Sequence, residues 1–262
     1  MIHLNKDAVQ LVPGNIPVVF LHAFPMNHKM WEPQIAFLRE KGFTSIAPDL
    51  PGFGGSQLAE SDTLTSYSER ICRLLEVLEV HQAVFVGLSM GGYLALELFR
   101  HIPEKFVGLL LANTRATADT PVVRERRAEI IKQIEESGEL GEVLTFHLEN
   151  FLTAGAREKN PELKRLVWQI LQEASAQSIC QAQRAMAKRP DFLDLLQDMQ
   201  FPVTVVASEG DALTTLEDAR AMMERLPDGH LEIIQNSAHL SNMEQPVAFN
   251  RALMRLIEKV RG

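Results

Sequence analysis

The sequence contains a serine framed by glycines, in the run Gly87-Leu88-Ser89-Met90-Gly91. This G-x-S-x-G pattern follows an apolar run typical of a strand and precedes a pattern typical of a helix. A serine between a strand and a helix in this pattern is typical of a sharp turn that exposes the serine hydroxyl. Glycine two residues before and after the serine leaves such a turn the space that it needs. We therefore predict that Ser89 is a nucleophile; the alternative is a glycine-rich turn with no catalytic meaning.

A serine nucleophile needs a histidine base and a carboxylate that orients the histidine, here in the chain order serine, acid, histidine. Asp211 follows the apolar run 203–207, and His239 follows the apolar run 231–234. Catalytic groups gather at the carboxyl ends of the strands in open α/β sheets. We therefore predict a catalytic triad of Ser89, Asp211 and His239.

Two further residues compete for these roles. Glu209 lies in the same loop as Asp211, but Gly210 frees the backbone directly before Asp211, which favours Asp211 as the acid. His22 comes directly after a predicted strand and before a turn. We predict that His22 holds this loop by hydrogen bonds rather than acting as the base.

The chemistry also requires two backbone N–H donors for the oxyanion that develops on the substrate. The amide of Met90 comes directly after the nucleophile and begins a predicted helix, so the helix dipole favours a negative charge there. The second donor is expected in the loop after the run 17–21. Phe24 is the candidate, because Pro25 has no N–H to donate.

Short apolar runs rich in β-branched residues predict a parallel sheet covered on both faces, because their hydrophobicity is continuous and does not alternate. The runs are 17–21, 43–47, 83–87, 106–111, 203–207 and 231–234. Apolar residues at helical spacing predict helices over 63–78 and 246–260. This alternation predicts an α/β fold. A short β pair at 2–4 and 9–12 is expected to form its first element.

The alternation of strands and helices stops after residue 111 and resumes at residue 201. The segment between them predicts helices only, punctuated by glycine and proline. The expected helices are 121–137, 140–152, 161–171 and 176–188. We therefore expect an α/β core formed by residues 1–113 and 200–262, with a helical cap inserted at residues 114–199.

Such a cap would overhang the strand ends and shape a pocket there. Several apolar side chains are candidates for its lining, although packing between helices explains them at least as well. They are Phe146, Phe151, Leu152 and Trp168 from the cap, with Phe24, Met26 and Met90 from the core. The basic run Arg124-Glu125-Arg126-Arg127 is expected to be a solvated helix face that Glu129 compensates, given the acidic balance of the chain.

Composition argues against several classes of function. The chain has 262 residues, with 26 Lys and Arg against 34 Asp and Glu and a net charge of −8, which disfavours nucleic acid and anionic membranes as partners. Cys72 and Cys180 form neither a disulfide framework nor a metal-ligand spacing. The first residues lack the pattern of a secretory signal, and no run of 18 apolar residues occurs. We expect a cytoplasmic protein, monomeric or homodimeric.

Five stretches of the chain resemble the α/β-hydrolase superfamily. They are HAFP at 22–25, DLPGFGGS at 49–56, GLSMGG at 87–92, GD at 210–211 and HLSNMEQP at 239–246. The resemblance implies an eight-stranded, mostly parallel sheet flanked by helices, with the inserted helices as a cap. Within the superfamily, the chain is most similar to small bacterial carboxylesterases and 3-oxoadipate enol-lactonase-like proteins. It departs from the lactonases after Asp49, where their typical arginine and second histidine are missing, and Ala23 stands where glycine is commoner.

These features predict hydrolysis of a carboxylic ester through an acyl-enzyme intermediate. His239 would take the proton of Ser89, Ser89 would attack the ester carbonyl, and Asp211 would hold the imidazole in the productive tautomer. No metal or organic cofactor is expected, and the partner is a small-molecule ester or lactone. The open alternatives are a lactonase, a carbon-carbon bond hydrolase, an acyltransferase, a perhydrolase and a non-catalytic binding protein, the last disfavoured by the intact triad.

Overall fold

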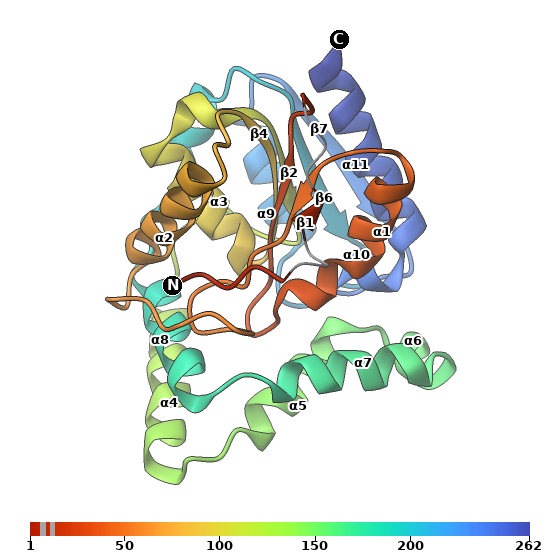
Figure 1. Ribbon diagram of the computed structural model, residues 1–262. Helices are drawn as coiled ribbons and strands as arrows, with labels where there is room; N and C mark the ends of the chain where they lie inside the picture. The colour runs from red at the N-terminus through yellow and green to blue at the C-terminus, as the bar shows by residue number, and fades with distance from the viewer. Residues whose placement is uncertain (6–8, 11–13) are drawn as a thin grey trace.

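The strands of the protein form one sheet. The computed structural model describes residues 1–5, 9–10 and 14–262. Among these residues, seven strands follow the order β1-β3-β2-β4-β5-β6-β7, and every neighbouring pair is parallel except β1 with β3 (Figure 1). The strands are β1 (Val9–Gln10), β2 (Val18–Leu21), β3 (Ser45–Ile46), β4 (Ala83–Leu88), β5 (Phe106–Ala112), β6 (Val203–Ser208) and β7 (Gly229–Ile234).

The six predicted apolar runs all become strands of this sheet. β2, β4 and β6 are buried along their whole length, which is why their sequences show no polar alternation. β7 lies at the edge of the sheet and is only partly buried.

The expected number of eight strands is wrong for the described residues, which form seven. Residues 2–4 are not a strand, because the backbone of His3 is bonded to a loop: its N–H donates to Ser56 Oγ at 2.7 Å, and its carbonyl accepts from the N–H of Asp49 at 3.2 Å. Of the expected strand at 9–12, Val9–Gln10 is β1, which pairs with β3, and residues 11–12 lie outside the described residues.

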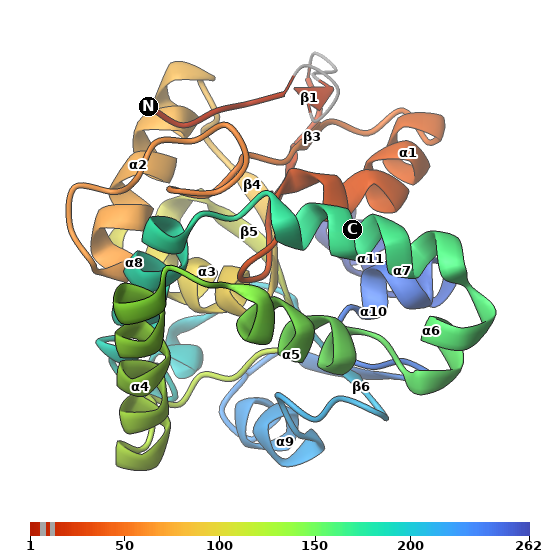
Figure 2. The same cartoon turned by 90° about the horizontal axis from the view of Figure 1, so that it is seen from below.

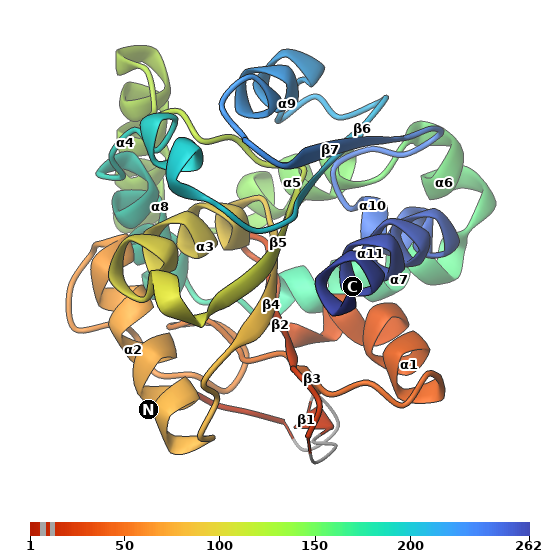
Figure 3. The same ribbon diagram turned by 90° about the horizontal axis from the view of Figure 1, so that it is seen from above.

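Helices cover both faces of the sheet (Figure 3). α1 (Glu32–Glu40) and α11 (Pro246–Arg261) lie on one face, and α2 (Leu64–Val77), α3 (Met90–His101) and α9 (Leu216–Met223) lie on the other. α3 packs between the sheet and α2, which explains why nearly all of its side chains are buried. The shorter helices are η2 (His28–Trp31), η3 (Pro103–Lys105), η4 (Asp194–Asp198) and α10 (Ser241–Glu244).

Residues 114–199, which we call the helical insertion, run from β5 to β6 and are described throughout. Their helices are α4 (Pro121–Ser137), α5 (Gly141–Phe151), α6 (Ala154–Lys159), α7 (Pro161–Gln172) and α8 (Ala176–Ala187). All but α6 were predicted from the sequence to within one residue at each end. α6 has only 6 residues, too few for a periodic pattern, and it begins where the side chain of Thr153 accepts from the N–H of Ala156.

The helical insertion lies beneath one end of the sheet, as Figures 1 and 2 show. Local signals fix its first helix: Thr120 caps α4 by accepting from the N–H of Val123, and Gly138 ends it with a φ of 72°. Across the described ranges of the chain, none of the helices combines the length and the apolar sequence that a membrane span requires.

Candidate active site

Ser89 lies on a strained turn between β4 and α3, as the sequence predicts. Its φ of 55° and ψ of −116° are rare for a residue with a side chain. A Cβ atom on Gly87 would lie 2.4 Å from the carbonyl oxygen of Gly91, and a Cβ on Gly91 would lie 1.9 Å from the carbonyl oxygen of Leu21. These two positions therefore admit only glycine, and they let α3 begin directly against β2 and β4.

The backbone of this turn is held by the end of β5. The N–H of Ser89 donates to the carbonyl of Ala112 at 3.0 Å, and the hydroxyl of Thr114 donates to the carbonyl of Ser89 at 2.8 Å. Thr114 also leaves no room at Gly92, where a Cβ would lie 2.5 Å from its Oγ1. Sequence analysis missed Thr114; its position just after a predicted strand was the available signal.

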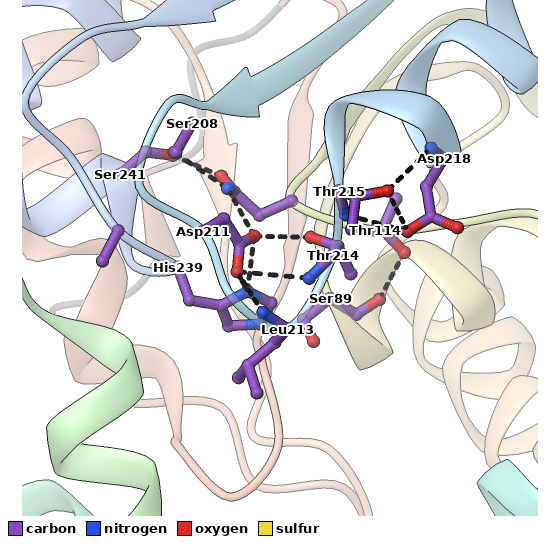
Figure 4. A network of polar contacts seen from close by, with 12 residues as sticks. Ser89, Thr114, Ser208, Asp211, Leu213, Thr214, Thr215, Asp218, His239 and Ser241 are labelled. Carbon is purple, nitrogen blue, oxygen red and sulfur yellow. Dashed lines mark hydrogen bonds and ion pairs between the residues drawn. The ribbon is translucent and has the colours of Figure 1, made fainter. Parts of the chain in front are cut away.

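The predicted acid and base form a buried pair at the ends of β6 and β7. Nδ1 of His239 lies 2.8 Å from Oδ2 and 3.0 Å from Oδ1 of Asp211, and both side chains are almost fully buried. Ser89 and His239, both labelled in Figure 4, line the same cavity. Because Nδ1 faces the carboxylate, Nε2 is the ring nitrogen left to exchange a proton with a hydroxyl.

Several donors surround the carboxylate of Asp211 (Figure 4). Leu213 N–H donates to Oδ1 at 2.8 Å, and Asn113 Nδ2 and the Thr214 hydroxyl donate to Oδ2. Burial alone would raise the pKa of Asp211, but the charge of His239 and the hydrogen bonds from His239, Thr214 and Asn113 together hold this pKa well below its usual value. Asp211 is therefore a carboxylate at neutral pH, as an orienting acid must be.

Asn113 joins the strand ends on which the predicted triad depends. It directly follows β5, has a φ of 44°, and donates to the hydroxyl of Ser208 at 2.8 Å as well as to Asp211. Its Oδ1 accepts from the hydroxyl of Ser241 at 2.6 Å. Sequence analysis missed Asn113. It follows β5, which lies between the strands that precede Ser89 and Asp211, and this position was a usable signal.

Glu209 does not form the hydrogen bond to His239. It is exposed, and its carboxylate accepts from the N–H of Asn236 at 3.5 Å. Asp211, and not Glu209, is the carboxylate hydrogen-bonded to His239, and its role as the acid stays a prediction.

His22 holds a loop, as predicted. Its Nε2 accepts from the N–H of Leu50 at 2.8 Å, so its Nδ1 carries the proton and donates to the carbonyl of Ala23 at 2.9 Å. Burial lowers the pKa of His22 to about 4, against the opposing effect of the Ala23 bond. The ring is therefore neutral, and it ties the loop after β2 to the loop after β3.

The two predicted oxyanion donors come from segments next to Ser89. Phe24 lines the cavity that Ser89 and His239 line, and its ring meets the edge of the His147 ring at a centroid distance of 5.2 Å. Met90 is the first residue of α3 and is fully buried. Its amide is one of the N–H groups at the helix start that have no partner within the helix. The role of both amides stays a prediction.

The cavity above Ser89 has a volume of about 240 Å³ and reaches into the helical insertion. Of the predicted apolar lining residues, Phe24, Phe146 and Phe151 line it. Trp168 instead lines a surface groove between α5 and α7. The remaining candidates pack in the core: Leu152, Met26 and Met90.

The basic run at the start of α4 differs from the prediction. Arg126 and Arg127 line the cavity together with Arg115, rather than forming only a solvated face. The sequence pattern could not reveal this, because the packing of α4 against α8 decides which side of the helix meets the cavity.

The helical insertion is bonded directly to the loop that carries His239. The Phe151 ring stacks on the imidazole of His239, with centroids 5.5 Å apart and an interplanar angle of 20°, and its carbonyl accepts from the N–H of Leu240 at 3.0 Å. Glu244 accepts from the N–H of Thr153 at 3.0 Å with one carboxylate oxygen and from the N–H of Ala238 at 2.8 Å with the other. The position of the insertion and the position of His239 are therefore linked.

Comparison with known proteins agrees with this architecture. Residues 18–252 match the alpha/beta hydrolase family. The chain is 31% identical over 238 residues to 3-oxoadipate enol-lactonase 1 of Acinetobacter baylyi, covering 90% of this chain and 87% of the relative. A thermophilic esterase from Thermogutta terrifontis superposes with a TM-score of 0.90 at 28% identity, covering 99% of this chain and 100% of the esterase.

A third likeness concerns the fold alone. The enol-lactonase from Burkholderia xenovorans LB400 superposes with a TM-score of 0.88 at 20% identity, covering 98% of this chain and 96% of the enol-lactonase. The family match spans β2 to β7, the helical insertion and all the residues of the predicted triad. The chain belongs to the alpha/beta hydrolase family and is a hydrolase.

Proposed function

We propose that the protein hydrolyses carboxylic esters through a Ser89, His239 and Asp211 triad and an acyl-enzyme intermediate. The observation that carries this proposal is the buried hydrogen bond between Asp211 and Nδ1 of His239, at the cavity that Ser89 also lines. The strained turn at Ser89 adds support, because backbone strain of this kind is found where a side chain must be presented for chemistry.

In the first half of the reaction, Oγ of Ser89 attacks the ester carbonyl and its proton passes to Nε2 of His239. The amides of Phe24 and Met90 donate to the oxyanion of the tetrahedral intermediate, each worth about 3 kcal/mol if it acts like other such donors. The tetrahedral intermediate then collapses, because the bond between the former carbonyl carbon and the oxygen of the leaving alkoxide breaks. His239 returns its proton to the alkoxide, so an alcohol leaves and the acyl group stays on Ser89.

In the second half, a water molecule gives a proton to Nε2 of His239 and attacks the acyl carbonyl. The bond to Ser89 then breaks, Oγ takes the proton back from His239, and a carboxylic acid leaves. The Asp211 carboxylate stabilises the imidazolium that forms in both halves. Each step moves only an acyl group and protons between residues of this chain and water.

We further propose that the helical insertion (114–199) is a cap on a core of residues 1–113 and 200–262. Its residues Phe146, Phe151 and Arg126 contribute to the wall of the cavity above Ser89, which supports a role in choosing the substrate.

A lactone is the second candidate substrate. The 31% identity to an enol-lactonase of Acinetobacter baylyi favours it, and the same triad opens a cyclic ester by the same steps. In a lactone the alcohol produced stays attached to the acid product.

Steady-state hydrolysis of p-nitrophenyl esters of rising acyl length, beside a panel of lactones, tests the proposal. Ser89→Ala should lower kcat/KM by about 10⁴-fold or more, because it removes the group that is acylated. Ser137→Ala, a matched change at an exposed serine of α4, should leave the rate unchanged. Rates that are equal in the wild type and in Ser89→Ala would overturn the triad, and turnover of lactones only would establish the second candidate.

A further inference from the structure

The cavity above Ser89 is positively charged in a chain that is acidic overall. Among the described residues, its wall contains three arginines, Arg115, Arg126 and Arg127, and one carboxylate, that of Asp119. These side chains give the wall a formal charge of +2, whereas the whole chain has a net charge of −8. A concentration of positive charge at a substrate cavity favours an anionic ligand.

Arg127 is already paired inside the protein. Its Nε donates to Asp119 at 2.6 Å and its Nη1 donates to Gln183 at 2.5 Å. Asp119 accepts a second guanidinium, that of the fully buried Arg189, at 2.7 Å. Asp119 thus serves two arginines. Its negative charge therefore does not compensate any other positive group of the cavity.

Arg115 is likewise engaged at the side of the cavity. It donates to the carbonyl of Leu213, and its Nη2 lies 3.8 Å from the carboxylate of Asp218. Its charge is therefore partly compensated, and its Nη2 is directed at the loop that follows Asp211.

Arg126 differs from the other two arginines. It is exposed on α4, and its Cζ lies 4.9 Å from the centroid of the Phe146 ring on α5. Across the described ranges of the chain, no carboxylate lies within 4.0 Å of its guanidinium nitrogens. The Phe146 ring thus contacts the guanidinium, whose N–H donors form no hydrogen bond with the described residues.

The neighbouring histidine adds no competing charge. His147 also lines the cavity, and its pKa is lowered to about 4, first by burial and then by the charges of His239, Arg127 and Arg126, against a raising effect from its bond to the Val143 carbonyl. The His147 ring is therefore neutral at physiological pH. It adds no second charge to that of Arg126 in the cavity.

We propose that Arg126 is a carboxylate-binding subsite, and that the protein acts on half-esters of dicarboxylic acids. The ester carbonyl would lie at Ser89 and the free carboxylate of the acyl group would pair with the Arg126 guanidinium, which can hold a carboxylate through two N–H donors. This inference rests on the proposed ester hydrolysis, because it places the reacting carbonyl at Ser89.

Paired substrates test the subsite. Monomethyl succinate, glutarate and adipate are each compared with the neutral methyl ester of the same chain length, using the wild type, Arg126→Glu and Arg124→Glu. Arg124 lies on the same helix but does not line the cavity, so its variant matches the change in net charge.

The wild type should prefer the half-esters, and Arg126→Glu should lower kcat/KM for them by about 10- to 100-fold, the range of a charge-assisted hydrogen bond. The same variant should lower kcat/KM for the neutral esters much less, because they have no group for the guanidinium, so the ratio of the rates for half-ester and neutral ester should fall by about tenfold or more. Arg124→Glu should keep the preference of the wild type. Equal losses in the two variants, or no preference for half-esters in the wild type, would overturn the subsite.

A binding measurement separates this proposal from the proposed function. Calorimetric titration of adipate into Ser89→Ala, and into the double variant with Arg126→Glu, does not depend on turnover. Binding that weakens at least about tenfold on loss of Arg126 supports the subsite even if no ester is hydrolysed. Adipate binding that does not change would overturn the subsite even if neutral esters are hydrolysed through Ser89.

Discussion

At the scale of single residues, burial keeps the His22 ring neutral. His22 has a pKa of about 4 in the folded protein, whereas its ordinary value of 6.5 applies to the unfolded chain. As the pH falls, the unfolded chain binds a proton first. The free energy of unfolding should therefore decrease as the pH drops from about 6.5 towards 4, by at most about 3 kcal/mol from this residue.

Replacing His22 by glutamine tests this expectation. Glutamine can still accept from the N–H of Leu50 but cannot titrate, so the variant should lose stability less steeply with falling pH, whatever its stability at neutral pH. Urea unfolding at a series of pH values between 4 and 7 gives the slope for both proteins. Parallel slopes would show that His22 is not held neutral by the fold.

At the scale of elements, the close approach of α3 to the strands depends on single glycines. Gly91→Ala would place a Cβ 1.9 Å from the carbonyl of Leu21, so α3 or β2 would have to move. We expect a loss of more than about 2 kcal/mol in the free energy of unfolding, measured in urea, together with loss of ester hydrolysis.

Gly141→Ala is the matched control, because α5 begins at Gly141 and no atom lies within 4 Å of the added Cβ. Alanine favours a helix over glycine by about 1 kcal/mol, so this variant should be as stable as the wild type or slightly more stable. A Gly91→Ala protein that matches Gly141→Ala in stability would refute the steric account of the Ser89 turn.

The elements also differ in how far the sequence determines them. β4 and β6 could be predicted because strands covered on both faces must be apolar throughout. Helices α4 and α7 could be predicted because Thr120 and Asn160 cap them and proline follows each cap. Residues 2–4 could not be predicted, because their partner is a distant loop rather than a strand.

The same distinction holds for the predicted site. Ser89, Asp211 and His239 follow strands in a recognisable order, so their meeting at one end of the sheet could be inferred. Asn113 and Thr114 act through contacts between segments far apart in the chain; their position after a predicted strand could place them near the site but could not reveal these contacts. The side of α4 that meets the cavity is likewise set by tertiary packing.

At the scale of the whole molecule, Glu244 links the helical insertion to the core. Its carboxylate accepts from Thr153 in the insertion and from Ala238 next to His239. Glu244→Ala leaves these donors without their acceptor, so we expect kcat to fall by about tenfold and the free energy of unfolding to fall by about 1 to 3 kcal/mol.

Glu244→Gln keeps one strong acceptor and should recover part of the loss in kcat. Glu258→Ala, at an exposed position of α11, is the control for removal of a carboxylate. Steady-state kinetics of these variants with one ester gives kcat and KM separately. An unchanged kcat in Glu244→Ala would mean that the link has no influence on His239.

The proposed function depends on acylation of Ser89 during turnover. The most direct measurement is acid quenching of the protein during hydrolysis of a p-nitrophenyl ester, followed by peptide mass spectrometry. We predict that the acyl mass appears on the peptide that contains Ser89 in the wild type, and that it is absent from Ser89→Ala. Turnover by the wild type with an acyl group on another residue, or undiminished turnover by Ser89→Ala, would contradict the account.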